Sequence, residues 1–289
     1  MDIEHFLKQT SIDLTKTYKE NVNIDHSLMQ QIMDYAFLGG KGIRAALVVL
    51  TGQAFGANYS NLMIPALAVE LIHSYSLVHD DLPAMDNDSM RRGKASTHNA
   101  FGEANAILTG DALLTQAFIC ISSSCLNDAT KILLIQELSK AAGANGMIAG
   151  QMMDMAAQNQ ITDYEHLCNI HNLKTGAIIS ASVLMGAYTS SYYNIKDIDN
   201  LKSFSRHIGL AFQVYDDLLD VTKDSKTLGK PANSDVDNNK ATFPALIGIE
   251  QTRELVEVHT NLAKQSLTKL NVKTEQLSNF VEYIIQREF

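Results

Sequence analysis

The stretch Ile-Pro-Ala-Leu-Ala-Val-Glu-Leu-Ile-His-Ser-Tyr-Ser-Leu-Val-His-Asp-Asp-Leu-Pro, residues 64–83, joins a long apolar run to an acidic doublet. Its three- and four-residue apolar spacing predicts a helix from about Ile64 that ends at Asp80-Asp81, before Pro83. A similar frame recurs as Gln-Val-Tyr-Asp-Asp-Leu, residues 213–218. The two copies predict two helices that face each other across a cavity.

The same helical spacing covers almost the whole chain, and only four prolines interrupt it. Gly39-Gly40 is expected to break the first helical region, and polar loops are expected at about 84–98 and 222–240. Ile43 to Leu50 fits a buried strand or the start of a buried helix equally well. Gly143, Gly146 and Gly150 indicate closely packed backbone, since no strand precedes them to form a phosphate loop. No low-complexity linker divides the chain, so the sequence predicts one all-α domain over residues 1–289.

Composition excludes several classes of protein. A chain of 289 residues with 46% hydrophobic residues can bury a large core, and a net charge of −9 argues against a nucleic-acid partner. The polar N-terminus lacks a signal segment, and no uninterrupted apolar run reaches the roughly 18–20 residues of a membrane span. Cys120, Cys125 and Cys168 lack metal-ligand spacing. We therefore expect a cytoplasmic protein without stable membrane insertion.

The acidic clusters predict a metal site. Asp216 and Asp220 share one helix face with Asp217 beside them, and Gln213 lies one turn earlier. A solvated surface is the alternative, but the apolar residues around these acids favour an internal site. Asp80 and Asp81 stand at a helix C-terminus, where carboxylates are disfavoured without a cation. Oxygen ligands of this kind suit Mg²⁺ bound together with substrate phosphates.

Other polar residues surround these two clusters. Asp86 returns from the loop after Pro83, and Asp88 either joins the first cluster or lies at the surface. Basic residues recur beside acids and glycines, and those that we single out are Lys41, Arg44, Arg91, Arg92, Lys94, Lys174, Lys223, Lys230 and Lys240. Each alone fits a solvated surface, whereas their recurrence predicts a diphosphate site, because such anions favour guanidinium forks beside Mg²⁺.

Two histidines of the opening stretch need a separate interpretation. His79-Asp80 has the form found in metal phosphohydrolases, but that class explains neither the second acidic cluster nor the basic run. We interpret His73 as a buried or phosphate-contacting histidine and His79 as structural.

Taken together, these residues resemble the trans-isoprenyl diphosphate synthases, and among them the bacterial farnesyl diphosphate synthases. The resemblance covers nearly the whole chain. It rests on the segments 73–86, Arg91-Arg92-Gly93-Lys94, Gly150-Gln151-Met152-Met153-Asp154, Lys174-Thr175-Gly176 and 212–220, in this order.

The resemblance implies an all-α bundle around a deep central cavity, a homodimer, and three Mg²⁺ between the acidic helices. It implies these roles: metal ligands Asp80, Asp86 and Asp216, with Asp81, Asp217 and Asp220 as further or supporting partners; allylic diphosphate binding by Arg91, Lys174 and Lys230; isopentenyl diphosphate binding by Gly40, Lys41, Arg44, His73 and Arg92; and Thr175 and Gln213 facing the reacting carbon. The implied reaction is Mg²⁺-assisted ionisation of an allylic diphosphate followed by attack of isopentenyl diphosphate.

Two departures from the family pattern stand out. The usual Gly-Gly-Lys-Arg-x-Arg-Pro reads Gly-Gly-Lys-Gly-Ile-Arg-Ala here, so Gly42 and Ala45 replace Arg and Pro. The chain ends Arg287-Glu288-Phe289 instead of on a basic tail, which leaves open whether the C-terminus closes over the diphosphate.

Product length is expected to depend on Tyr75, with Ser76 beside it. Tyr75 lies five residues before Asp80, about 7.5 Å along the helix. An aromatic side chain there implies a floor that stops growth at farnesyl diphosphate, with geranyl and geranylgeranyl diphosphate as alternatives. A terpene cyclase fits less well, because Asp216, Asp217 and Asp220 replace the expected Asn/Ser/Glu triplet. A helical lipid-binding protein without catalysis leaves the six carboxylates unexplained.

Overall fold

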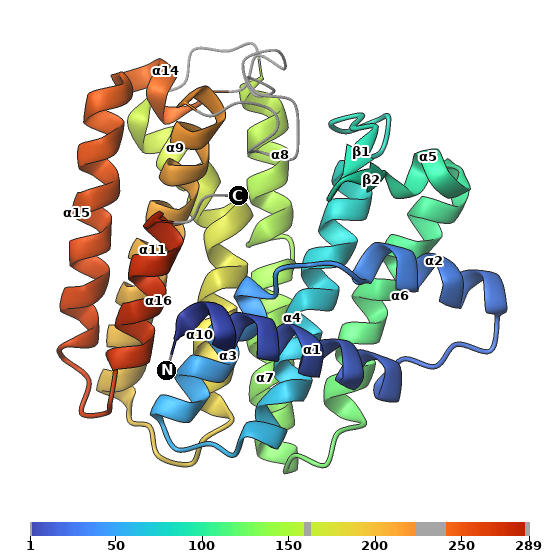
Figure 1. Cartoon of the computed structure of the whole chain (residues 1–289), viewed down its shortest axis with the longest axis horizontal. Coiled ribbons are helices and arrows are strands. Elements are labelled where there is room, and N and C mark those ends of the chain that lie inside the picture. Colours follow the sequence, from blue (N-terminus) through green and yellow to red (C-terminus); the bar gives the residue numbers. More distant parts are fainter. Residues whose placement is uncertain (1, 159–162, 223–240, 287–289) are drawn as a thin grey trace.

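The computed structural model describes residues 2–158, 163–222 and 241–286. Its helices are α1 (Ile3–Asn21), α2 (Ser27–Phe37), α3 (Ile43–Ala54), α4 (Tyr59–Asp80), α5 (Thr97–Phe101), α6 (Glu103–Ser122), α7 (Asp128–Ala142), α8 (Met147–Ala157), α9 (Tyr164–His171), α10 (Ala177–Tyr188), α11 (Ile195–Thr222), α14 (Phe243–Ile247), α15 (Ile249–Leu267) and α16 (Glu275–Gln286). A π-helical turn, Asn172–Gly176, joins α9 to α10, and strands β1 (Met90–Arg91) and β2 (Lys94–Ala95) form a small hairpin. The all-α prediction is confirmed (Figure 1).

Most predicted helix boundaries agree with the structure. Gly39-Gly40 separates α2 from α3, and the segment that starts at Ile43 is a helix, which settles the open alternative. The prediction for α4 was wrong at its start, because the helix begins at Tyr59 and contains Pro65. An internal proline costs about 3 kcal/mol. Leu62 and Leu67 on either side are fully buried, and burying each such side chain contributes about 1.5–3 kcal/mol, so packing outweighs that cost.

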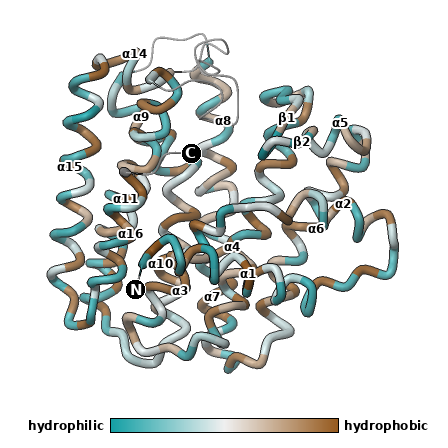
Figure 2. Tube along the Cα trace, in the orientation of Figure 1, coloured by the Kyte–Doolittle hydropathy of each residue, from teal (hydrophilic) through white to brown (hydrophobic). Residues whose placement is uncertain are grey.

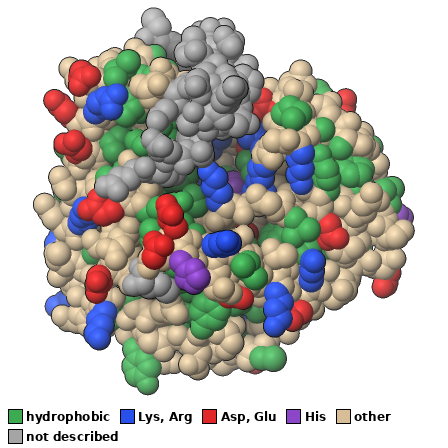
Figure 3. Space-filling view, viewed as in Figure 1, with side chains coloured by type: hydrophobic (Ala, Val, Ile, Leu, Met, Phe, Trp, Pro, Cys, Tyr) green, Lys and Arg blue, Asp and Glu red, His purple; other side chains and the backbone are tan. Residues whose placement is uncertain are grey.

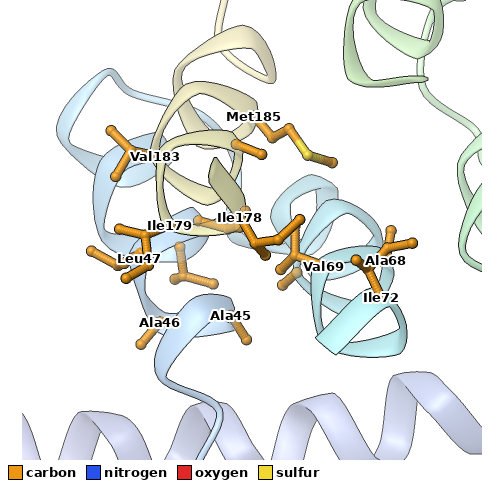
Figure 4. Close-up of a cluster of buried hydrophobic side chains, with 14 of the residues drawn as sticks. Ala45, Ala46, Leu47, Ala68, Val69, Ile72, Ile178, Ile179, Val183 and Met185 are labelled. Carbon is orange, nitrogen blue, oxygen red and sulfur yellow. The ribbon is translucent and has the colours of Figure 1, made fainter. Parts of the chain in front are cut away.

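The core lies where α3, α4 and α10 pack together. Figure 4 shows side chains of the three helices interleaved, with Leu47 from α3, Val69 from α4 and Ile178 from α10. Two glycines allow α3 and α10 to approach closely: a Cβ at Gly186 would lie 2.4 Å from the Val48 carbonyl oxygen, and one at Gly52 would lie 3.0 Å from the Gly186 carbonyl oxygen. The first turn of α3 and the body of α4 are therefore rigid supports for the residues that they carry.

The remaining helices surround this core. The long helix α11 packs against α10 on one side and α15 on the other. Figure 2 shows hydrophilic and hydrophobic residues alternating along α15, and its buried positions, among them Thr252, Val256 and Thr260, recur at four-residue spacing. In Figure 1, α4 and α11 both finish at the end of the molecule that carries the hairpin and α14. The two acidic clusters therefore lie at the same end of the bundle.

By length and average hydropathy, α4 and α6 are apolar enough to cross a membrane. In α4, 72% of the apolar window is buried inside the fold, and in α6 the share is 44%. A buried core helix passes the same test, so α4 is explained by its packing. On α6, Ile107, Leu108 and Ile119 are exposed.

Candidate active site

The first acidic cluster lies where α4 ends and the chain turns back. Asp80 is the last residue of the helix, and Asp81 is its C-cap. The backbone N–H of Asp86 donates to the Asp80 carbonyl oxygen over 2.9 Å, so the turn returns Asp86 to the helix end, as predicted. Carboxylates gathered at a helix C-terminus favour a bound cation, because the helix dipole adds negative potential there.

Asp81 is 2% exposed and contacts Arg91. Its Oδ1 accepts from Nε of Arg91 over 2.9 Å and from Nη2 over 2.5 Å, and Nη2 also donates to Asp88 over 2.9 Å. Burial raises the pKa of the Asp81 carboxyl, and the Arg91 guanidinium partly offsets this. Asp88, which the sequence left open, thus joins the cluster through Arg91. The two carboxylates together fix the orientation of the Arg91 guanidinium.

A two-residue turn directs Arg91 and Arg92 to different neighbours. Arg92 has φ 53° and Gly93 has φ 74°, which is the left-handed geometry that suits a tight hairpin. For a non-glycine residue this conformation costs about 1–2 kcal/mol. The Arg92 guanidinium lies against Gly40, where a Cβ would come within 3.2 Å of Nη2, and Nη1 donates to the Phe37 carbonyl oxygen over 3.4 Å. The Arg92 side chain therefore contacts the loop before α3, whereas the Arg91 side chain contacts the end of α4.

The hairpin is also tied to α2 through Tyr35. The Tyr35 hydroxyl donates to the Ala95 carbonyl oxygen over 2.6 Å, and the Lys94 ammonium donates to the Tyr35 carbonyl oxygen. The Lys94 Nζ also lies 3.9 Å from the centre of the Tyr35 ring, within cation–π range. Sequence analysis missed both Tyr35 and the hairpin. The dipeptide Arg92-Gly93 is the signal that could have indicated a two-residue turn.

A second group of cations gathers where α3 begins. Gly42, with φ 64°, is the N-cap of α3, Arg44 lies in its first turn, and His73 comes from α4. Burial lowers the pKa of His73 well below its usual value, and the guanidiniums of Arg44, Arg92 and Arg91 lower it further. The imidazole is therefore neutral, and the positive charge of this group is carried by the arginines. Figure 3 shows several Lys and Arg side chains near the centre of the face that is viewed in Figure 1.

A buried glutamate completes this group, and sequence analysis missed it. Glu70 is 4% exposed, and its Oε1 accepts hydrogen bonds from the backbone N–H groups of Arg44 and Ala45. An ionisable residue inside an otherwise apolar helix was the available signal.

The second acidic cluster is part of a chain of hydrogen bonds. The Thr175 hydroxyl donates to Oε1 of Gln213 over 3.1 Å, and Nε2 of Gln213 donates to Oδ1 of Asp217 over 3.0 Å. Oδ2 of Asp217 accepts from the backbone N–H of Phe243 over 3.1 Å. Asp217 and Asp220 are buried, whereas Asp216 is partly exposed. Asp217 therefore fixes the Gln213 amide and, through it, the Thr175 hydroxyl.

Lys174 lies in the π-helical turn between α9 and α10. Its ammonium donates to Oδ2 of Asp154 on α8 over 2.6 Å. Gly150 permits this approach, because a Cβ there would lie 2.2 Å from the Lys174 backbone nitrogen. The prediction that Gly150 marks closely packed backbone is thus confirmed. A π-helical turn widens the helix by one residue and often occurs at functional sites. The partnership of Asp154 with Lys174 was not anticipated.

The expected chain-length residues lie one turn and more before Asp80. Tyr75 is 6% exposed, and its hydroxyl has no hydrogen-bond partner among the described residues. Burial raises the pKa of Tyr75 to about 12, with a further contribution from Asp80. The Ser76 hydroxyl donates to the His73 carbonyl oxygen over 2.9 Å, so its polar group stays on its own helix. His79 packs on Gly110, where a Cβ would lie 2.0 Å from Nε2, in agreement with a structural role.

Magnesium would have to be held by carboxylates from two helix ends. Within residues 2–158, 163–222 and 241–286, no group of three or more His, Cys, Asp or Glu is placed to hold one ion. Mg²⁺ bound through one or two carboxylates plus phosphate oxygens does not require such a group, so Asp80, Asp86 and Asp216 fit the donor chemistry. Several of the predicted features lie outside the described residues. They are Lys223, Lys230 and Lys240, the part of the expected 222–240 loop that begins at residue 223, and the C-terminal Arg287-Glu288-Phe289.

Comparison with known proteins gives a consistent result. Residues 26–281 match the family model described as polyprenyl synthetase. The chain is 45% identical over 264 residues to the farnesyl diphosphate synthase of Escherichia coli, covering 89% of this chain and 88% of that protein. It is 39% identical to a chloroplastic geranylgeranyl pyrophosphate synthase of Catharanthus roseus, covering 99% of this chain and 82% of that protein.

The solved structures agree. One is a geranyltransferase of Helicobacter pylori complexed with magnesium and isoprenyl diphosphate. It superimposes with a TM-score of 0.86 and 29% identity, covering 99% of this chain and 97% of that one. Family model, relatives and fold thus agree with the acidic and basic groups described above. The chain belongs to the polyprenyl synthetase family, and it is a prenyltransferase that elongates prenyl chains head to tail.

Proposed function

We propose that the product is farnesyl diphosphate, made by condensing isopentenyl diphosphate first with dimethylallyl and then with geranyl diphosphate. The observation that carries the condensation of two diphosphates is that cations lie on separate elements. Arg44 and Arg92 lie with His73 where α3 begins, and Lys174 lies on the π-helical turn. Two groups suit a reaction that holds two diphosphates at once. The relative from Escherichia coli and the buried aromatic ring of Tyr75 support the farnesyl product.

We assign the residues as follows. The metal ligands are Asp80, Asp86 and Asp216, with Asp81, Asp217 and Asp220 in support; the allylic diphosphate is bound by Arg91, Lys174 and Lys230; isopentenyl diphosphate is bound by Gly40, Lys41, Arg44, His73 and Arg92; and Thr175 and Gln213 face the reacting carbon. The magnesium in the related Helicobacter pylori structure supports Mg²⁺ as the metal, and three ions per site is our proposal.

The chemistry begins with cleavage of the allylic C–O bond, which leaves a diphosphate anion and an allylic cation. Arg91 is held in place by Asp81 and Asp88, and Lys174 is held by Asp154. Both cations are therefore oriented before the leaving charge develops, which is the condition for electrostatic catalysis. Bound Mg²⁺ would add Lewis-acid stabilisation of the same charge.

The second step joins the two substrates. The double bond of isopentenyl diphosphate attacks the allylic cation, and a proton then leaves to the released diphosphate. Thr175 and Gln213 present oxygen atoms whose orientation is set by the bonds from Thr175 to Gln213 and from Gln213 to Asp217. Such fixed dipoles can stabilise a cation at the reacting carbon, and no nucleophilic side chain is needed.

Tyr75 gives the sharpest test of product length. Tyr75→Ala is expected to extend the main product beyond C15, because a floor side chain is removed. Truncating a buried aromatic residue costs about 3–5 kcal/mol of unfolding free energy, so product analysis should be done well below the melting temperature. Chromatography of the dephosphorylated products measures chain length. A Tyr75→Ala protein that still stops at C15 would disprove this role.

Tyr75→Phe is the matched control. The Tyr75 hydroxyl has no hydrogen-bond partner among the described residues, so its removal should not lower stability. The ring remains, and C15 should stay the main product. The related geranylgeranyl pyrophosphate synthase makes that longer product the leading alternative, and the same chromatogram distinguishes the two.

We also propose that residues 1–289 form one domain, that the protein is a homodimer, and that it is cytoplasmic. The exposed apolar residues Ile107, Leu108 and Ile119 on α6 support a second copy as partner. Light scattering after size-exclusion chromatography tests the dimer, and fractionation of cells tests the location.

A further inference from the structure

Glu70 is a buried acid whose role the reaction described above leaves unexplained. Glu70 is 4% exposed, and its neighbours in the sequence, Val69 and Leu71, are fully buried. A carboxylate in such surroundings is costly unless it is hydrogen-bonded or paired with a positive charge. The hydrogen bonds and charges around Glu70 should therefore show why this carboxylate is buried.

The carboxylate holds the first turn of the neighbouring helix α3. Oε1 of Glu70 accepts from the backbone N–H of Arg44 over 3.1 Å and from that of Ala45 over 3.0 Å. These are the second and third residues of α3, where N–H groups lack partners within the helix. The N-cap residue, Gly42, has no side chain to satisfy them. Glu70 therefore caps α3 from another helix, and its negative charge also suits the positive end of the helix dipole.

The same carboxylate also acts on Arg92. Burial lowers the pKa of the Arg92 guanidinium, and the main effect that opposes it is the charge of Glu70. Arg92 in turn lies against Gly40. His73 follows Glu70 by three residues on α4, on the same face of the helix. Glu70 thus lies among the separate elements that carry the proposed isopentenyl diphosphate residues.

One of the two hydrogen bonds to Glu70 depends on which residue stands at position 45. Residue 45 is alanine, which has a backbone N–H to donate, whereas a proline there would have none. Here the Ala45 N–H is present, buried, and accepted by Glu70. Ala45 therefore supplies the second hydrogen bond between α4 and the start of α3.

We propose that Glu70 is a positioning residue for isopentenyl diphosphate, acting through the first turn of α3 rather than by touching the substrate. This inference rests on the proposed assignment of Arg44 and Arg92 to that substrate. Without the carboxylate charge, the first turn of α3, which carries Arg44, is held less firmly, and the diphosphate must order it on binding. Arg91 and Lys174, which we assign to the allylic diphosphate, are held by Asp81, Asp88 and Asp154. The hydrogen bonds that hold them do not involve Glu70.

The test compares Glu70→Gln with Glu137→Gln. Glutamine keeps an acceptor oxygen but loses the charge, so the first turn of α3 should remain helical while the hydrogen bonds from the Arg44 and Ala45 N–H groups weaken. We expect the KM for isopentenyl diphosphate to rise about tenfold, as when one charge-assisted hydrogen bond is weakened. The KM for dimethylallyl diphosphate should stay within about twofold, since its residues keep their partners. Glu137 is a half-buried acid on α7 whose charge interacts with those of Lys140 and Lys202, neither of which is a proposed site residue, so its substitution should change neither KM.

Calorimetric titration with isopentenyl diphosphate alone gives a second measurement that needs no turnover. A weaker affinity in Glu70→Gln, with a melting temperature close to that of Glu137→Gln, supports positioning. Equal changes in both KM values, or none in either, would overturn the inference. Failure of the unsubstituted protein to condense its substrates would instead contradict the proposed function, and the titration would still report on Glu70.

Discussion

Replacing Asp216 with asparagine is expected to lower kcat by about two to three orders of magnitude, the effect of losing one main electrostatic contact in an active site. Asparagine has the same shape but no charge, so it is a poor ligand for Mg²⁺. Removing one of three like charges on a helix face should not lower the free energy of unfolding of the metal-free protein. A titration of activity against Mg²⁺, together with thermal unfolding followed by circular dichroism, measures both effects.

Asp199→Asn is the control for that experiment. Asp199 is exposed on the same helix, α11, far along the sequence from the acidic cluster. Its kcat and Mg²⁺ dependence should match those of the unsubstituted protein. If Asp216→Asn kept kcat within threefold of the unsubstituted protein, Asp216 would not be a metal ligand.

Gly150→Ala is expected to damage both stability and activity. The new Cβ would lie 2.2 Å from the Lys174 nitrogen and 2.6 Å from its Cα, and these backbone atoms cannot rotate away. The helix α8 must then separate from the π-helical turn, at a cost of about 1–3 kcal/mol for overpacking. Displacing Lys174 and Thr175 by about 1 Å should lower kcat about a hundredfold. Chemical denaturation and steady-state kinetics measure the two losses.

Gly176→Ala provides a contrast within the same turn. Its Cβ would meet the His171 carbonyl oxygen at 3.4 Å, an ordinary van der Waals distance, and its backbone conformation suits alanine. We expect little change in stability or kcat. Equal losses in both variants would show that the turn tolerates no side chain at all, and that the contact between Gly150 and Lys174 is not the cause.

Much of the fold could be predicted from the sequence because its signals are local. Helical spacing and paired glycines fixed where α2 ends and α3 begins, and Pro83 marked the end of α4. The return of Asp86 to Asp80 also follows from a proline-containing turn. The predicted start of α4 at about Ile64 was wrong, because burial of the residues around Pro65 decides the helix, and burial is a property of the whole fold.

The remaining site contacts join residues that are distant in sequence, and no local pattern shows them. Glu70 reaches Arg44 across 26 residues, and Asp154 reaches Lys174 across 20. The hairpin has strands of two residues each, too short to show alternation. The resemblance supplied candidate residues for the site, whereas the structure supplied the partners that orient them.

The most direct test of the central claim is incubation of the purified protein with isopentenyl diphosphate, dimethylallyl diphosphate and Mg²⁺, followed by analysis of product length. We predict condensation with farnesyl diphosphate as the main product, and no product when Mg²⁺ is removed by a chelator. Absence of condensation in the presence of Mg²⁺ would contradict the account.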